Sequence, residues 1–135
     1  MQITRQTEYA IKTMLELAAL PPDEILSTKT ISKRQAIPED FLKKTIKLLA
    51  MGGMVKTYRG SQGGVKLARS PAQITLADII MAIEGPLAIN VCLSPGYHCP
   101  QVAYCPVTGI LARAQAAMLQ ELNRETLADL AGGMK

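Results

Sequence analysis

The 135-residue chain has no tryptophan, a single phenylalanine, a single histidine and only three cysteines. With so few aromatic rings, it lacks the stacking platforms on which single-stranded nucleic acids bind. No apolar run approaches the roughly 20 residues that a membrane-spanning helix requires, and the N-terminus has no apolar signal-peptide core. An odd number of cysteines argues against a disulfide framework. We therefore expect a cytoplasmic protein of about one domain, with free or metal-bound thiols.

Positive charge is concentrated in the first half of the chain. Residues 1–70 carry 12 basic and 6 acidic side chains, whereas residues 71–135 carry 3 basic and 5 acidic ones, so the net charge of +4 hides a strong asymmetry. A field of this sign attracts polyanions, of which nucleic acid is the commonest. Because aromatic residues are scarce, double-stranded DNA is the better partner; a merely solvated basic face is the alternative.

Three helical segments follow one another in this basic half. Apolar residues recur at one-turn spacing ahead of Pro21, a short helix is predicted from about Thr28 to Gln35, and a third helix begins near Pro38 and ends at Gly52. The third helix places polar residues at i, i+3, i+4 and i+7 on one face, opposite an apolar stripe: Asp40, Lys43, Lys44 and Lys47. This division is typical of a recognition helix in a helix-turn-helix, although an ordinary amphipathic helix shows it too.

A basic hairpin follows the third helix. Residues 54–59 and 65–69 read as strands, joined by the glycine-rich turn Gly60-Ser61-Gln62-Gly63-Gly64. Such a hairpin is typical of a wing, with Arg59 at the base of its tip, where it can reach a minor groove. A plain surface hairpin is the alternative.

The second half begins with a capping-box pattern that occurs twice. Thr75-Leu76-Ala77-Asp78 precedes one apolar run, and Thr126-Leu127-Ala128-Asp129 repeats the pattern near the C-terminus. Between them, a long helix is predicted from about Gly109 to Asn123, and its many alanines permit close helix approach. We expect this helix to form the seam of a two-fold dimer.

All three cysteines lie in the Pro/Gly-rich segment before the long helix. Cys92, Cys99 and Cys105 are spaced Cys-x6-Cys-x5-Cys, and clustered thiolates suit a soft metal. Zinc would need a fourth ligand such as His98, but there is no Cys-x2-Cys knuckle, and an iron–sulfur cluster tolerates irregular spacing better. Unligated thiols are the remaining reading. No nucleophile–base pairing or phosphate-binding loop is present, so we do not expect an enzyme.

The whole pattern resembles the bacterial IscR-like iron–sulfur cluster regulators, a group that includes NsrR-like nitric-oxide sensors. The resemblance covers nearly the full chain: the opening Met1-x-Ile3-Thr4, the Ile37-x-x-x-Phe41-Leu42 entry to the recognition helix, the Arg59-Gly60-x-x-Gly63-Gly64 wing and the cysteine triplet. It implies a dimeric winged-helix transcription factor with one cluster per subunit, held by Cys92, Cys99 and Cys105, and a wing whose Arg59 enters the minor groove.

One position departs from the family. IscR-like proteins usually carry a histidine three residues after the third cysteine, where this chain has Thr108. The fourth ligand therefore stays open between His98 and Glu8, because in NsrR-like relatives an acidic residue near this N-terminal place ligates the cluster of the other subunit. A [2Fe–2S] cluster is favoured, with [4Fe–4S] as the alternative.

These observations define the sequence-based expectations. The fold is mainly α with a small β-wing, divided into a winged helix-turn-helix at 1–85, a cysteine loop at 86–108 and a dimerisation and C-terminal helix at 109–135. The expected function is that of a homodimeric regulator of palindromic DNA that senses cluster status and controls genes for iron–sulfur cluster biogenesis. The alternatives are a nitric-oxide or redox sensor of the same fold, or a zinc or thiol regulator without a cluster. The predicted DNA-binding residues are Lys33, Arg34, Glu39, Asp40, Lys43, Lys44, Lys47, Arg59, Gly60 and Ser61.

Overall fold

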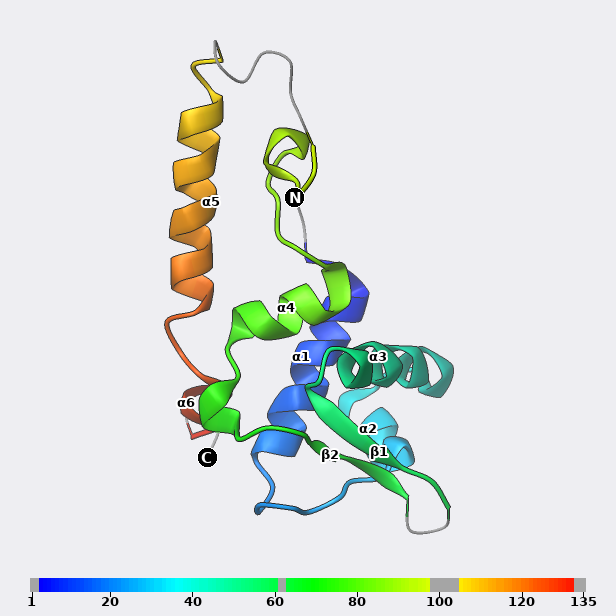
Figure 1. Ribbon diagram of the computed structural model, residues 1–135. Helices are drawn as coiled ribbons and strands as arrows, with labels where there is room; N and C mark the ends of the chain where they lie inside the picture. The colour runs from blue at the N-terminus through cyan, green and yellow to red at the C-terminus, as the bar shows by residue number, and fades with distance from the viewer. Residues whose placement is uncertain (1–2, 61–62, 98–104, 133–135) are drawn as a thin grey trace.

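The computed structural model describes residues 3–60, 63–97 and 105–132, and it is mostly helical (Figure 1). In chain order the elements are α1 (Arg5–Ala18), α2 (Thr28–Gln35), α3 (Glu39–Met51), β1 (Val55–Tyr58), β2 (Gly64–Leu67), the 3-10 turn η1 (Pro71–Gln73), α4 (Leu76–Glu84), the 3-10 turn η2 (Val91–Leu93), α5 (Thr108–Leu122) and α6 (Leu127–Gly132). The prediction of a mainly helical chain with a small two-stranded sheet is confirmed.

Local capping sets the boundaries of the first helices. The Thr4 hydroxyl accepts from the Thr7 amide at 3.2 Å, and the Ser27 hydroxyl accepts from the Thr30 amide at 3.1 Å. Each bond satisfies an amide that the helix itself leaves without a partner. At the end of α2, Ala36 adopts the left-handed conformation, with φ of 54°. The chain turns there, and α3 begins after Pro38, as in a helix-turn-helix.

The hairpin after α3 is joined to the loop between α1 and α2. Strands β1 and β2 are antiparallel, with Val55 opposite Leu67 and Tyr58 opposite Gly64. Leu26 adds a bridge on the other side of β2, since Leu26 N donates to Val65 O at 3.0 Å and Val65 N donates to Leu26 O at 2.9 Å. A Cβ atom on Gly64 would lie 2.5 Å from the Leu26 oxygen. Only glycine therefore permits this close approach of the wing to the loop.

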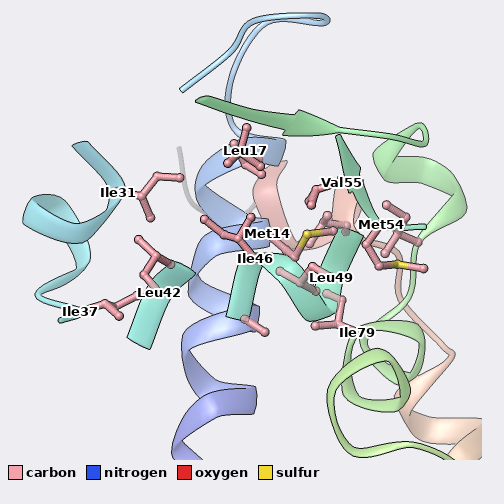
Figure 2. Packing of buried hydrophobic residues seen from close by; sticks show 14 residues of the cluster. Met14, Leu17, Ile31, Ile37, Leu42, Ile46, Leu49, Met54, Val55 and Ile79 are labelled. Atoms are coloured by element: carbon pink, nitrogen blue, oxygen red, sulfur yellow. The ribbon is translucent and has the colours of Figure 1, made fainter. Parts of the chain in front are cut away.

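The hydrophobic core lies where α1, α3 and α4 cross (Figure 2). Met14 of α1, Leu42 and Leu49 of α3, and Ile79 of α4 are all fully buried. Burial of each such side chain contributes roughly 1.5–3 kcal/mol. Leu127 of α6 belongs to the same cluster at 1% exposure, so the C-terminal helix returns to the core formed by the N-terminal helices.

Helix α5 contributes no buried residue to this core. It runs alongside the helical unit, from the cysteine segment down to α6 (Figure 1). None of its residues is buried, and Ile110 is 56% exposed. A 15-residue helix with an uncovered apolar side has a surface available to a partner.

Candidate nucleic-acid interface and cysteine segment

The outer face of α3 carries the predicted recognition residues. Lys43, Lys44 and Lys47 are exposed, whereas Leu42, Ile46 and Leu49 on the other side of the helix are buried. Lys43 lies 3.9 Å from Glu39 one turn earlier, with both side chains solvated, so this ion pair contributes little. Within the described residues, no ion pair involves Lys44 or Lys47. The face is therefore positively charged and open to solvent.

The two basic residues at the end of α2 differ from each other. Lys33 is exposed, whereas Arg34 Nη1 lies 2.9 Å from Glu16 Oε1 on α1. The other oxygen of the same carboxylate accepts from Gln35 Nε2 at 2.9 Å, and the Glu16 side chain is only 15% exposed. Glu16 thus holds the end of α2 on α1 and pairs with Arg34, whose side chain stays 57% exposed. The sequence pattern did not indicate this contact, because the partners are 18 residues apart.

The wing presents Arg59 at its exposed tip, next to Gly60 with a φ of 100°. Ser61, the remaining predicted contact of the wing, lies outside the described residues. On β2, the Lys66 ammonium lies 3.1 Å from Asp23 Oδ1 and 5.8 Å from the centre of the Tyr58 ring. The hydrogen bond to Asp23 raises the pKa of Lys66. The Lys66 charge is therefore paired with the loop between α1 and α2. Arg59 is the exposed cation next to the described part of the wing tip.

Two of the three cysteines fall within the described residues. Cys92 lies on η2, which packs against α5, and its sulfur accepts a 3.5 Å hydrogen bond from Asn90 Nδ2. Cys105 lies just before α5, and both thiols are free and partly exposed. The hydroxyl of Thr108, followed by the amides of Val107 and Thr108, lowers the pKa of Cys105 by stabilising its thiolate. Cys99 and His98 lie outside the described residues.

Thr108 has a role that sequence reasoning missed. This residue stands where IscR-like proteins usually carry a histidine, and its hydroxyl serves the Cys105 sulfur.

Glu8 is exposed in the first turn of α1, and its neighbour Thr7 connects that turn to α4. Thr7 is completely buried, and its hydroxyl donates to Glu84 Oε2 at 2.6 Å. Glu84 is the last residue of α4, just before the chain enters the cysteine segment. The start of α1 is therefore directly bonded to the end of α4, a contact across 77 residues that sequence reasoning did not anticipate.

Two absences apply to the described ranges only. In the part of the chain that the structure describes, no three His, Cys, Asp or Glu side chains come together as a metal site. None of the helices described there has the length and apolarity needed to cross a lipid bilayer.

Comparison with known proteins places these features in a family. Residues 3–133 match the Rrf2 family, described as iron-dependent transcriptional regulators. The transcriptional regulator NsrR of Geobacillus kaustophilus is 35% identical over 131 residues, which cover 96% of this chain and 89% of that protein. Among solved structures, IscR of T. potens has a TM-score of 0.78 at 27% identity, with 100% of this chain and 89% of that chain covered. CymR, the global cysteine regulator of B. subtilis, has a TM-score of 0.77 at 29% identity, with 98% and 97% covered.

Proposed function

The chain belongs to the Rrf2 family of DNA-binding transcriptional regulators, and from this we propose that it acts as a homodimer whose cysteines hold an iron–sulfur cluster and whose DNA affinity follows the state of that cluster. The DNA-binding unit comprises α1 to α4 with the wing. The dimer forms through α5. The sensing segment lies between these two parts.

The placement of the thiols carries the proposal. Cys92 lies on a turn packed against α5, and Cys105 lies just before the first turn of α5, while neither sulfur belongs to the hydrophobic core. A group bound by these sulfurs acts on the helix that joins the two subunits. At its other end the segment follows directly after α4, whose last residue, Glu84, accepts a hydrogen bond from the buried Thr7 hydroxyl of α1. A change in the segment therefore acts on α5 at one end and on α4 of the DNA-binding unit at the other.

The donor set fits an iron–sulfur cluster. Cys92, Cys99 and Cys105 would supply three thiolates, the ligands that iron–sulfur clusters take. Thr108 is a poor fourth ligand, because it is neutral and its hydroxyl already serves Cys105. His98 or the exposed carboxylate of the partner subunit's Glu8 completes the set. When bound, the cluster would supply reactivity toward oxygen or nitric oxide and sensitivity to iron supply.

The DNA half of the proposal rests on the exposed cations. Lys43, Lys44 and Lys47 present a charged face for the major groove, and Arg59 extends from the wing toward a minor groove. Asp40, Glu39 and Gly60 border these contacts. Lys33 and Arg34 at the end of α2 would contact phosphate; both are exposed, and Arg34 also pairs with Glu16.

The decisive experiment compares holo and apo protein on DNA. The protein is reconstituted anaerobically with iron and sulfide, its visible absorption and electron paramagnetic resonance are recorded, and its affinity is measured for duplexes selected from a random pool. We expect a visible chromophore and a change in affinity of about 5- to 150-fold, the usual size of allosteric coupling. Equal holo and apo affinities would refute cluster sensing. Stoichiometric zinc without colour would identify the zinc regulator, and dependence on thiol oxidation alone would identify the thiol regulator.

A second set of variants identifies the fourth ligand. Glu8→Ala, His98→Ala and Thr108→Val are reconstituted under the same conditions, and cluster spectra and decay rates are compared. We expect Glu8→Ala to give a more labile cluster with an altered spectrum, because loss of an oxygen ligand leaves one iron site to water. If Glu8→Ala matches the parent and His98→Ala loses the cluster, ligation by the partner subunit's Glu8 is wrong.

A further inference from the structure

The repeated Thr-Leu-Ala-Asp pattern forms the same capping box twice. In α4, Thr75 N donates to Asp78 Oδ2 at 3.0 Å and Asp78 N donates to the Thr75 hydroxyl at 3.3 Å. At the start of α6, Thr126 and Asp129 make the same two bonds at the same two distances. A cap explains each pattern separately. It does not explain why the two caps come together.

In the fold the two caps lie side by side. Thr75 and Thr126 form an antiparallel bridge, and Leu127 N donates to Ile74 O at 2.7 Å. Ile74, Ala77 and Leu127 are all buried beneath them, at 2% exposure or less. The start of α6 is therefore fastened to the start of α4 and to the core. The chain that leaves α5 returns to the DNA-binding unit here, and α6 then packs on α1 and η1 (Figure 1).

The two threonine hydroxyls use their single proton differently. Thr126 Oγ1 donates to Asp129 Oδ2 at 3.0 Å, within its own capping box. Together with the Thr126 amide, which is the larger cause, this bond lowers the pKa of Asp129. Thr75 Oγ1 instead donates out of its box, to Asn123 Oδ1 at 2.7 Å. Asn123 is the C-terminal cap of α5, so the first cap is bonded to the end of that helix.

This bond joins the end of α5 to a firmly packed part of the fold. No α5 side chain is buried within the chain, whereas α4 packs on both α1 and α3. At the crossing of α3 and α4, a Cβ atom on Gly52 would come within 2.9 Å of the Ala82 Cβ atom. The other side-chain hydrogen bond to α5 in the described chain, from Ile89 N to Gln115 Oε1 at 3.0 Å, comes from the cysteine segment and not from the DNA-binding unit. The orientation of α5 relative to the recognition helix therefore depends on how Asn123 is joined to Thr75, the N-terminal cap of α4.

We propose that Thr75 and Asn123, here named the α4–α5 junction, are positioning residues that set the distance between the two recognition helices of the dimer and so select the spacing of DNA half-sites. The proposal rests on the homodimer proposed above. In a two-fold dimer joined through α5, the angle at each junction fixes where each α3 meets the duplex. One added base pair moves a half-site by about 3.4 Å and rotates it by about 35°. A dimer with a fixed junction angle binds the altered spacing more weakly, whereas a dimer with a loosened junction tolerates it.

The test measures tolerance to spacing and not affinity alone. A palindromic duplex is selected from a random pool with the parent protein, and affinities are measured for it, for versions with one central base pair added or removed, and for a single half-site. Asn123→Ala removes the acceptor of the junction bond, and Thr75→Val removes its donor. Asn123→Asp keeps an acceptor oxygen. Thr126→Val removes the matching hydroxyl of the second cap, which does not reach α5.

We expect Asn123→Ala and Thr75→Val to lower discrimination against the altered spacings by about fivefold, the equilibrium weight of one hydrogen bond. Half-site affinity should stay at the parent value, and Asn123→Asp and Thr126→Val should discriminate like the parent. Because Asn123 is exposed, its replacement leaves the core intact, which circular dichroism checks.

Two results would overturn the inference by itself: parental discrimination in both Asn123→Ala and Thr75→Val, or an equal loss in Thr126→Val. A parent protein that sediments as a monomer would overturn both this inference and the proposed homodimer. Sedimentation of the parent therefore separates the two failures.

Discussion

The exposed side of α5 allows a quantitative test of the dimer. Ile110, Ala114 and Ala117 follow one another at four- and three-residue steps, which places them on one stripe of the helix. All three are exposed, and Ile110 is the only large apolar member, with 56% of its surface open to solvent. Leu111, on another side, is half-buried within the chain. The small residues beside Ile110 would let a second α5 approach closely.

The exposed fraction of Ile110 sets how much the dimer should weaken when this side chain is removed. Full burial of an isoleucine contributes roughly 1.5–3 kcal/mol, so covering the exposed half contributes about 1 kcal/mol per subunit. Two-fold symmetry counts the contact twice, and a loss of about 2 kcal/mol raises the dimer dissociation constant roughly 30-fold. Ile110→Glu adds the cost of bringing two carboxylates into the seam, so its effect should be larger still.

Sedimentation velocity over a dilution series measures this constant. Ala112→Glu is the matched control, because residue 112 lies about 200° around the helix from residue 110 and is also exposed. Helicity should stay at the parent value in both variants, since α5 contributes no buried residue to the core. A dimer of Ile110→Glu as tight as the parent, or an equal weakening by Ala112→Glu, would refute the assignment of the seam to this stripe.

Three further predictions concern the thiols and the DNA contacts. Replacing Cys92, Cys99 or Cys105 by Ala should abolish the visible chromophore after reconstitution while the dimer stays folded; loss of the folded dimer in all three would mean that the cysteines are structural. In the reduced apoprotein, the lowered pKa of Cys105 keeps its thiolate present at a lower pH than that of an ordinary cysteine, so alkylation of Cys105 by iodoacetamide should begin at lower pH. Thr108→Val should shift the pH profile of the alkylation rate to higher pH. An unchanged profile would show that the Thr108 hydroxyl does not stabilise the thiolate. A dimer that neutralises about 6–10 phosphates should lose roughly 10³–10⁵ in DNA affinity between 50 and 200 mM salt. Arg59→Ala should weaken binding most at A·T-rich sites, and Lys43→Ala/Lys44→Ala should alter the base preference. Parental DNA binding by both variants would contradict the proposed interface.

Local signals in the sequence were sufficient for most element boundaries. Thr75 and Asp78 three residues apart predicted a helix start, and the capping box is present. The helix predicted from about Thr28 to Gln35 has those bounds, and Gly52 follows the end of α3. These features depend on residues within one turn of each other. The site residues are a different matter, because Cys99, His98 and Ser61 lie outside the described residues and the DNA contacts stay predictions.

Contacts between distant residues could not be read from the pattern. Periodicity showed that the start of α1 has a polar side with Glu8, but not that its buried Thr7 hydroxyl reaches Glu84. The basic composition of α2 predicted Arg34 as a DNA contact, which stays a prediction, but it did not show that Arg34 also pairs with Glu16 of α1. Side chains at equal intervals along a helix are equivalent until another element approaches one of them. Which one is approached depends on the path of the whole chain.

The sequence alone indicated a mainly helical DNA-binding regulator with a small β-wing, because charge, capping residues, turn glycines and thiol spacing are properties of short stretches. Tertiary structure alone decided how the parts are joined. It returned α6 to the core through Leu127, left α5 without a buried residue, and brought two similar caps together so that only Thr75 reaches Asn123. The physical reason is that a hydrogen bond or a buried surface requires two partners, and the sequence does not show which residues come into contact in the fold.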